Sequence, residues 1–219
     1  MNYKAYVITI EGMKQSEAAA ERCIASAQRQ GLEVYKHYGI TPKDDPEGIM
    51  KTEGIPVDGF REVYSYLDSC LSAFLSHYSL WKKCIQDNCQ YIIFEHDAVL
   101  IDILDFFAPF DKCMNIGAPS YGRYVTPSHL GVGPLTSKQY FPGAHAYRLK
   151  PAGAKLLIEQ AKQFAMPTDV FLHTDRFPWL QEQYPWPAKA RDTFTTIQRE
   201  QGCIAKHNWK DGIGYEIIR

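Results

Sequence analysis

The chain has 219 residues, of which 45% are hydrophobic and 22% charged, a composition typical of a folded globular protein rather than a disordered one. Its 24 basic and 25 acidic side chains give a net charge of -1, which argues against a general attraction to nucleic acid or anionic lipid. The net charge does not decide whether the surface has a local basic groove. The apolar run at residues 5–10 is too short for a signal-peptide core, and no run approaches the ~18 residues of a membrane span. We therefore expect one domain, residues 1–219, in the cytoplasm, with no membrane span.

The N-terminal part of the chain predicts a β-α-β unit. Residues 3–10 are rich in β-branched and aromatic side chains, as in a buried strand. Strong helix formers follow over residues 16–30, with Ser16 as a candidate N-cap, and residues 33–38 indicate a second strand. Such a unit pairs its strands in parallel and predicts an α/β fold. The stretch 39–59 is rich in Pro and Gly, so we expect a loop with little regular structure.

The middle of the chain alternates helix and strand patterns. After Asp68, apolar side chains recur at helical spacing, which predicts a helix packed on a sheet. The run YIIF at residues 91–94 predicts a central strand that is covered on both faces. We expect further strands at 114–117 and 144–149 and a long loop at 118–143. Helices are expected from Pro151 and from Thr168 or Asp169 towards Phe177, and the last forty residues are expected to be irregular.

Three polar residues, Glu95, His96 and Asp97, directly follow the predicted central strand. In open α/β sheets the carboxyl ends of the strands face the ligand crevice. Two carboxylates one residue apart suit Mn²⁺ or Mg²⁺, which prefer oxygen ligands and keep positions for substrate phosphates. The alternative is that Glu95 and Asp97 simply end a strand at the surface.

The segment 73–97 resembles the central signature of glycosyltransferase family 25, which includes lipopolysaccharide-biosynthesis and procollagen galactosyltransferases. The resemblance rests on Ser76-His77, Trp81-Lys82 and Glu95-His96-Asp97, the last standing where the family has a Glu-Asp-Asp triplet. Weaker matches extend over about three quarters of the chain; they are the strand at 5–10, Gly143, Ala146-Tyr147, Gly153-Ala154 and Pro167-Thr168-Asp169.

The resemblance implies a GT-A type α/β fold with a Rossmann-like, mixed, mostly parallel sheet flanked by helices. It also implies transfer of a sugar, such as galactose or glucose, from a nucleotide-sugar donor, usually a UDP-sugar. The acceptor would be a hydroxyl group on a glycan, and the anomeric carbon would be inverted. The candidate donor-binding residues are Ile8, Thr9, Glu95, His96 and Asp97. The candidate ligands of Mn²⁺ or Mg²⁺ are Asp97, Glu95 and His207.

The sequence departs from the family pattern at two positions. His96 replaces the middle acidic residue of the triplet, and Thr9 replaces the Asn usual on the first strand. In an extended chain His96 would point away from the face of its two neighbours, so we expect packing or a hydrogen bond rather than metal ligation. His77 and Trp81 are expected to pack near the triplet or to support it.

An inverting transfer needs a base that takes the acceptor proton, and a carboxylate is a natural candidate. Asp169 is the first candidate, because it matches the family's Pro-x-Asp, and Asp175 is the second. Alternatively, Asp169 or Thr168 is an ordinary helix cap. For His207, a surface or packed side chain is the alternative to a metal contact, which rests on analogy with other GT-A enzymes.

The aromatic side chains of the loop 118–143 suggest a platform on which an acceptor sugar could stack; they are Tyr121, Tyr124, His129 and Tyr140. An ordinary exposed loop is the alternative.

Three other functions are alternatives to sugar transfer to a glycan: sugar transfer to a modified nucleobase in DNA, binding of a nucleotide sugar without turnover, and nucleotidyl transfer. No Gly-rich phosphate loop follows the first strand to favour the last of these.

Overall fold

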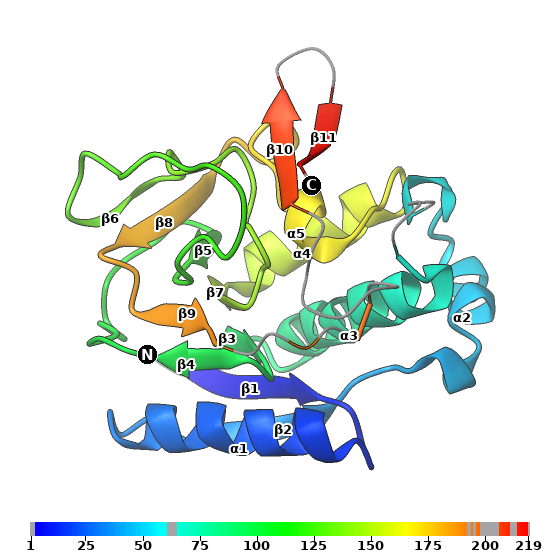
Figure 1. The fold of residues 1–219 in the computed structure, drawn as a ribbon, viewed down its shortest axis with the longest axis horizontal. Helices are drawn as coiled ribbons and strands as arrows, with labels where there is room; N and C mark the ends of the chain where they lie inside the picture. The colour runs from blue at the N-terminus through cyan, green and yellow to red at the C-terminus, as the bar shows by residue number, and fades with distance from the viewer. Residues whose placement is uncertain are drawn as a thin grey trace.

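The computed structural model describes residues 3–60, 65–191, 194 and 196–197, and the backbone alone of two strands at 206–210 and 214–218. A seven-stranded sheet forms its centre (Figure 1). Its strands are β1 (Tyr3–Thr9), β2 (Val34–Tyr38), β3 (Gln90–Glu95), β5 (Cys113–Asn115), β6 (Gly131–Pro134), β7 (Ala146–Leu149) and β8 (Leu180–Tyr184). Two further pairs are β4 (Ala98–Leu100) with β9 (Ala188–Ala190), and β10 (Lys206–Lys210) with β11 (Gly214–Ile218). The helices are α1 (Lys14–Gln28), α2 (Pro46–Glu53), α3 (Leu67–Gln86), α4 (Pro151–Ala161) and α5 (Thr168–Phe171), with 3-10 turns η1 (Pro42–Asp44) and η2 (Asp58–Phe60).

The order of strands in the sheet is β2-β1-β3-β7-β5-β8-β6. The strands β2, β1, β3, β5 and β8 run in one direction, whereas β7 and β6 run in the other. This arrangement confirms the expected α/β class and the mixed, mostly parallel sheet. The carboxyl ends of β1 and β3 lie side by side, since Ile8 is paired with Glu95.

Each face of the sheet has its own hydrophobic core. On one face α1 packs over Val7, Ile92 and Phe94, and on the other face α3 and α4 pack over Tyr91 and Ile93 (Figure 1). Successive residues of a strand point to opposite faces, so the continuous apolar run of β3 serves both cores. Glu95 continues this alternation on the side of α3.

Residues 39–59 contain a helix, α2, so the expectation of a loop was wrong. Pro46 stands in the first turn of α2, where a missing N–H costs nothing, and the side chain of Asp45 accepts a hydrogen bond from the Gly48 amide. Gly54, with φ of 71°, ends the helix in a left-handed conformation. Both proline and glycine therefore mark the ends of a helix here rather than its absence.

Three other boundaries differ from expectation. The helix α1 begins at Lys14, so Ser16 lies inside its first turn and is no N-cap. The helix α5 stops at Phe171 rather than continuing to Phe177, because the backbone of Leu172 leaves the helical region. The last forty residues include β8 and β9 besides the hairpin of β10 and β11, so they are not irregular.

Glu182 explains why β8, with its polar sequence LQEQY, can lie in the sheet. Its side chain is completely buried, and it accepts hydrogen bonds from the amides of Thr136 and Ser137 and from the indole of Trp186. These bonds attach the end of the segment 118–143 to the sheet. A buried carboxylate is tolerated only when several donors satisfy it in this way.

We expect Glu182→Ala to lower the free energy of unfolding by about 3 kcal/mol, because it leaves several buried donors without an acceptor. Glu182→Gln should cost less, since its amide oxygen can still accept from the two backbone amides. Urea unfolding of the three proteins measures the difference. Equal stability of the Ala variant and the wild type would contradict the role of Glu182 as an anchor.

Five cysteines, Cys23, Cys70, Cys84, Cys89 and Cys113, are free and buried, and Cys203 lies outside the described residues. Burial raises the pKa of Cys23 and of Cys84 to about 12. In the described part of the chain, none of the helices has the length and apolar character needed to cross a membrane.

Candidate active site

The carboxyl group of Glu95, at the end of β3, is held by a chain of hydrogen bonds that starts in the core. Trp81 Nε1 donates to Tyr147 Oη at 2.8 Å. The hydroxyl of Tyr147 lies 2.9 Å from His77 Nδ1, and His77 Nε2 lies 3.0 Å from Glu95 Oε1. The expectation that His77 and Trp81 support the triplet is confirmed, since α3 supplies both residues and β7 supplies the tyrosine between them.

Burial decides the charge of the imidazole in this chain of hydrogen bonds. It lowers the pKa of His77 to about 3, with a small opposing effect of the Asp169 charge, so the imidazole is neutral at physiological pH. The indole of Trp81 can only donate, so Tyr147 accepts from it, and the neutral imidazole carries one proton, either on the nitrogen that faces Tyr147 or on the one that faces Glu95. In either arrangement His77 shares a hydrogen bond with Glu95 and restrains the orientation of that carboxyl group.

Asp169 acts on the same group from another part of the chain. Burial and then the negative charge of Asp169 raise the pKa of Glu95 to about 8. Even so, 31% of the Glu95 side chain is accessible to solvent. The fold thus gathers two carboxyl groups that lie far apart in the sequence, and a cation between them would favour the ionised form of Glu95.

Asp169 lies in the first turn of α5, whose N-cap position is Pro167 and carries no capping side chain. The capping alternative for Thr168 and Asp169 is therefore wrong. One carboxylate oxygen, Oδ1, accepts from the Val170 amide, and the other accepts a short hydrogen bond from the hydroxyl of Tyr121. Asp169 thus faces the segment 118–143.

Lys138 completes this group of charges. Its ammonium donates to the Tyr121 carbonyl at 2.8 Å and to the Tyr140 hydroxyl at 2.9 Å, and it lies 4.9 and 4.8 Å from the centres of the two rings. Burial lowers the pKa of Lys138 to about 8, and Asp169 partly offsets that effect. Lys138 therefore places a positive charge where it interacts with the carboxyl group of Asp169.

The expected aromatic platform is only partly formed. Tyr140 is completely buried and offers no face to a sugar, and the hydroxyl of Tyr121 is engaged by Asp169. Tyr124 is 51% exposed and packs edge-on against Trp186 at 5.7 Å. The ring of His129 is partly buried against Gly133. Of the four side chains, Tyr124 is the one that presents a large exposed aromatic surface.

The residues after Glu95 form a turn into β4, so the extended chain assumed for His96 was wrong. His96 nevertheless packs and hydrogen bonds as expected: its ring stacks on Phe194 at 5.2 Å, and its Nδ1 lies 3.2 Å from Ser16 Oγ.

Thr9 is buried, with its hydroxyl 3.1 Å from the same Ser16 oxygen. Ile8 is partly buried and packs against the core on the α3 side.

Asp97 acts on the other layer of the molecule. Its charge adds to the burial that raises the pKa of the Cys23 thiol in α1, and its carbonyl accepts from the Arg191 amide. Among the described residues, no group of three or more His, Cys, Asp or Glu side chains is arranged to hold a metal ion. A cation at this edge of the sheet would therefore need further ligands from a bound substrate or from water.

Two further candidate residues, Asp175 and His207, follow Asp169 in the chain. The side chain of Asp175 is 68% exposed, and its carboxylate lies 3.5 Å from His173 Nδ1. The backbone of His207 belongs to β10, opposite Ile217, but its side chain lies outside the described residues.

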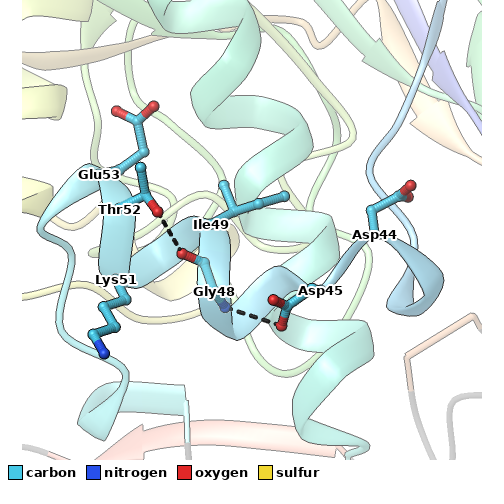
Figure 2. A pocket seen from close by; sticks show the side chains of 7 residues that line it. All are labelled: Asp44, Asp45, Gly48, Ile49, Lys51, Thr52 and Glu53. Carbon is cyan, nitrogen blue, oxygen red and sulfur yellow. Dashed lines mark hydrogen bonds between the residues drawn. The ribbon is translucent and has the colours of Figure 1, made fainter.

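A separate surface hollow lies over η1 and α2 (Figure 2). Its acidic side chains, Asp44, Asp45 and Glu53, point in different directions in the close-up view. Each is already engaged: Asp44 by Thr41, Asp45 by the Gly48 amide, and Glu53 by Lys82 at 2.6 Å. These contacts stabilise α2 and its packing on α3, and none of the residues around Glu95 lines the hollow.

The helix α3 and the strand β3, which supply His77, Trp81 and Glu95, lie within one segment that is similar to a known family. Residues 64–115 match glycosyltransferase family 25 (LPS biosynthesis protein). The resemblance of the signature from His77 to Asp97 is thereby confirmed. The family 25 match covers about a quarter of the chain, from the start of α3 to the end of β5, and does not include Asp169.

A solved structure of CTP:phosphocholine cytidylyltransferase from Streptococcus pneumoniae aligns with 87% of this chain and 94% of that chain, at 12% identity and a TM-score of 0.37. A search of curated protein sequences found no match.

Sequence patterns missed several residues of this group. Lys138, Tyr147 as the link to His77, and Ser16 as a partner of His96 were given no such role. Ser16 offered one signal, because it is a polar residue on the face of α1 that also carries Ala19, Ala20 and Cys23. The contacts of Lys138 with the two tyrosines have no counterpart in local sequence spacing.

Proposed function

We propose that the protein is a metal-dependent glycosyltransferase that moves a sugar from a nucleotide-sugar donor, a UDP-sugar, to a hydroxyl group of a glycan, with inversion. One observation carries the proposal: the fold brings Asp169 to Glu95, at the end of the strand that matches family 25. A carboxylate of this kind can supply a base, and a cation held by the carboxyl groups would stabilise a departing diphosphate.

In this proposal Asp169 takes the proton of the acceptor hydroxyl. The oxygen that now accepts from Tyr121 is the one suited to that step, since a hydroxyl group already lies within hydrogen-bonding distance of it. The acceptor hydroxyl would replace that of Tyr121.

Glu95 and Asp97 would serve the donor. The raised pKa of Glu95 indicates a carboxyl group that lacks a compensating positive charge, which fits a site for Mn²⁺ or Mg²⁺. Asp97 is the first candidate for direct ligation, Glu95 would bind the ribose or the ion through water, and His207 is a further candidate ligand. When bound, the ion would stabilise the negative charge of the leaving nucleoside diphosphate.

Release of UDP from UDP-galactose and UDP-glucose, with water as the acceptor, tests the proposal. We expect slow release that requires Mn²⁺ or Mg²⁺, and an increase in Tm with UDP and Mn²⁺ together. Binding without release would favour a nucleotide-sugar-binding module. If the protein neither binds nor cleaves any nucleotide sugar of a panel, the proposal is contradicted.

A further inference from the structure

The hydroxyl group of Ser16 joins three segments next to the candidate donor site. The amide of Ile10, after β1, donates to Ser16 Oγ at 2.9 Å. Thr9 Oγ1 lies 3.1 Å from the same oxygen, and His96 Nδ1 lies 3.2 Å from it. Both Ser16 and Thr9 are completely buried. One side chain in the first turn of α1 therefore connects the end of β1 with the turn that follows β3.

These contacts use the full capacity of the hydroxyl group, which has one proton and two lone pairs. The Ile10 amide occupies one lone pair. Of Thr9 and His96, one must donate to the second lone pair and the other must accept the Ser16 proton. Removing the oxygen would take a partner from all three groups at once, in a buried place where water compensates poorly.

His96 is the middle residue of the turn, between Glu95 and Asp97, so the position of its ring restrains both neighbours. That ring stacks on Phe194, with an angle of 5° between the planes, and a second contact is its bond to Ser16. The second contact ties the ring to α1, and through Thr9 and Ile10 to the end of β1. Loss of this link between α1 and the turn would move the side chains of Glu95 and Asp97 relative to the sheet.

We infer that Ser16 is a positioning residue for donor and metal binding: acting through His96, it holds the turn Glu95–Asp97 at the start of α1. This inference rests on the proposed function. Residues that orient the ligands of a metal or substrate typically change affinity or activity by about 10–100-fold when they are removed. Ser16 touches neither the donor nor the ion in this scheme.

The test compares Ser16→Ala with Ser26→Ala. Ser26 is also a buried serine of α1, and its hydroxyl makes two hydrogen bonds, to the Cys23 carbonyl at 2.7 Å and from the Leu100 amide at 3.0 Å. Both variants should lose some stability. Only Ser16→Ala should raise the KM for UDP-galactose or UDP-glucose and the Mn²⁺ concentration for half-maximal activity, each by about tenfold or more. It should also reduce the increase in Tm that UDP with Mn²⁺ produces, a measurement that needs no turnover.

His96→Phe provides a second variant in case Ser16→Ala does not fold. It keeps a ring against Phe194 and removes the nitrogen that contacts Ser16. We expect the same change in donor and Mn²⁺ dependence, and no further change in the double variant, because both substitutions break one link. Additive effects, or equal KM and Mn²⁺ values for Ser16→Ala and Ser26→Ala with normal turnover in both, would overturn the positioning role and leave the proposed function intact. If the wild-type protein neither binds nor turns over a nucleotide sugar, both proposals fall.

Discussion

Replacing Asp169 by Asn is expected to lower the turnover number for UDP release by about 10²–10⁴-fold, the scale of a lost general base. The amide has the shape of the carboxylate and can still accept the hydrogen bond of Tyr121, but it cannot take a proton. Binding of UDP with Mn²⁺, measured as the increase in Tm that the two ligands produce, should remain close to that of the wild type. Kinetics at saturating donor measure the loss.

Asp175→Asn separates the two candidate bases. Its carboxylate is exposed and close to His173, so we expect near-normal turnover in this variant. A large loss in Asp175→Asn together with normal activity in Asp169→Asn would move the base to Asp175. Full activity in both variants would mean that neither residue takes the acceptor proton.

For Asp97→Ala we expect the turnover number to fall by at least about a hundredfold, the scale of a lost electrostatic stabiliser. The reason is the proposed ligation of Mn²⁺ or Mg²⁺, so the concentration of metal needed for activity should rise as well. Titration of UDP release with Mn²⁺, alongside circular dichroism to confirm folding, measures both effects.

Asp102→Ala is a suitable control, because this exposed aspartate follows β4 and its carboxylate caps the amide of Ile103. It should leave the metal dependence unchanged. Unchanged turnover in a folded Asp97→Ala protein would end the assignment of Asp97 as a metal ligand. If only Glu95→Gln lowered the turnover number, Glu95 would then be assigned as the ligand of the ion.

Local patterns predicted those parts of the fold in which the spacing of apolar residues along one element decides its structure. The apolar run of β3 and the helical spacing in α3 are signals of this kind, and both elements lie where they were expected. The helix α2 was missed because Pro46 and Gly54 also occur at helix ends. The strand β8 was missed because Glu182 depends on donors that lie 46 residues earlier in the chain.

In the candidate site, too, the sequence identified single residues, whereas the contacts between them became visible only in the structure. Residue types and family resemblance singled out Glu95 and Asp169, but only the fold shows that their charges interact. The two departures from the family pattern, Thr9 and His96, were separate observations in the sequence. In the structure they meet at Ser16, and no spacing rule predicts a contact between side chains 80 residues apart.

The buried thiols give the protein its own reporters of transient opening. A small alkylating reagent can reach Cys23 or Cys84 only when the surrounding core separates, and the raised pKa leaves almost no reactive thiolate while the core is closed. The rate at which each thiol gains mass under native conditions therefore reports how often its layer of the sheet opens. Because Cys23 is a buried residue of α1 and Cys84 a buried residue of α3, the two rates would tell whether the helices on the two faces of the sheet separate from it together or independently.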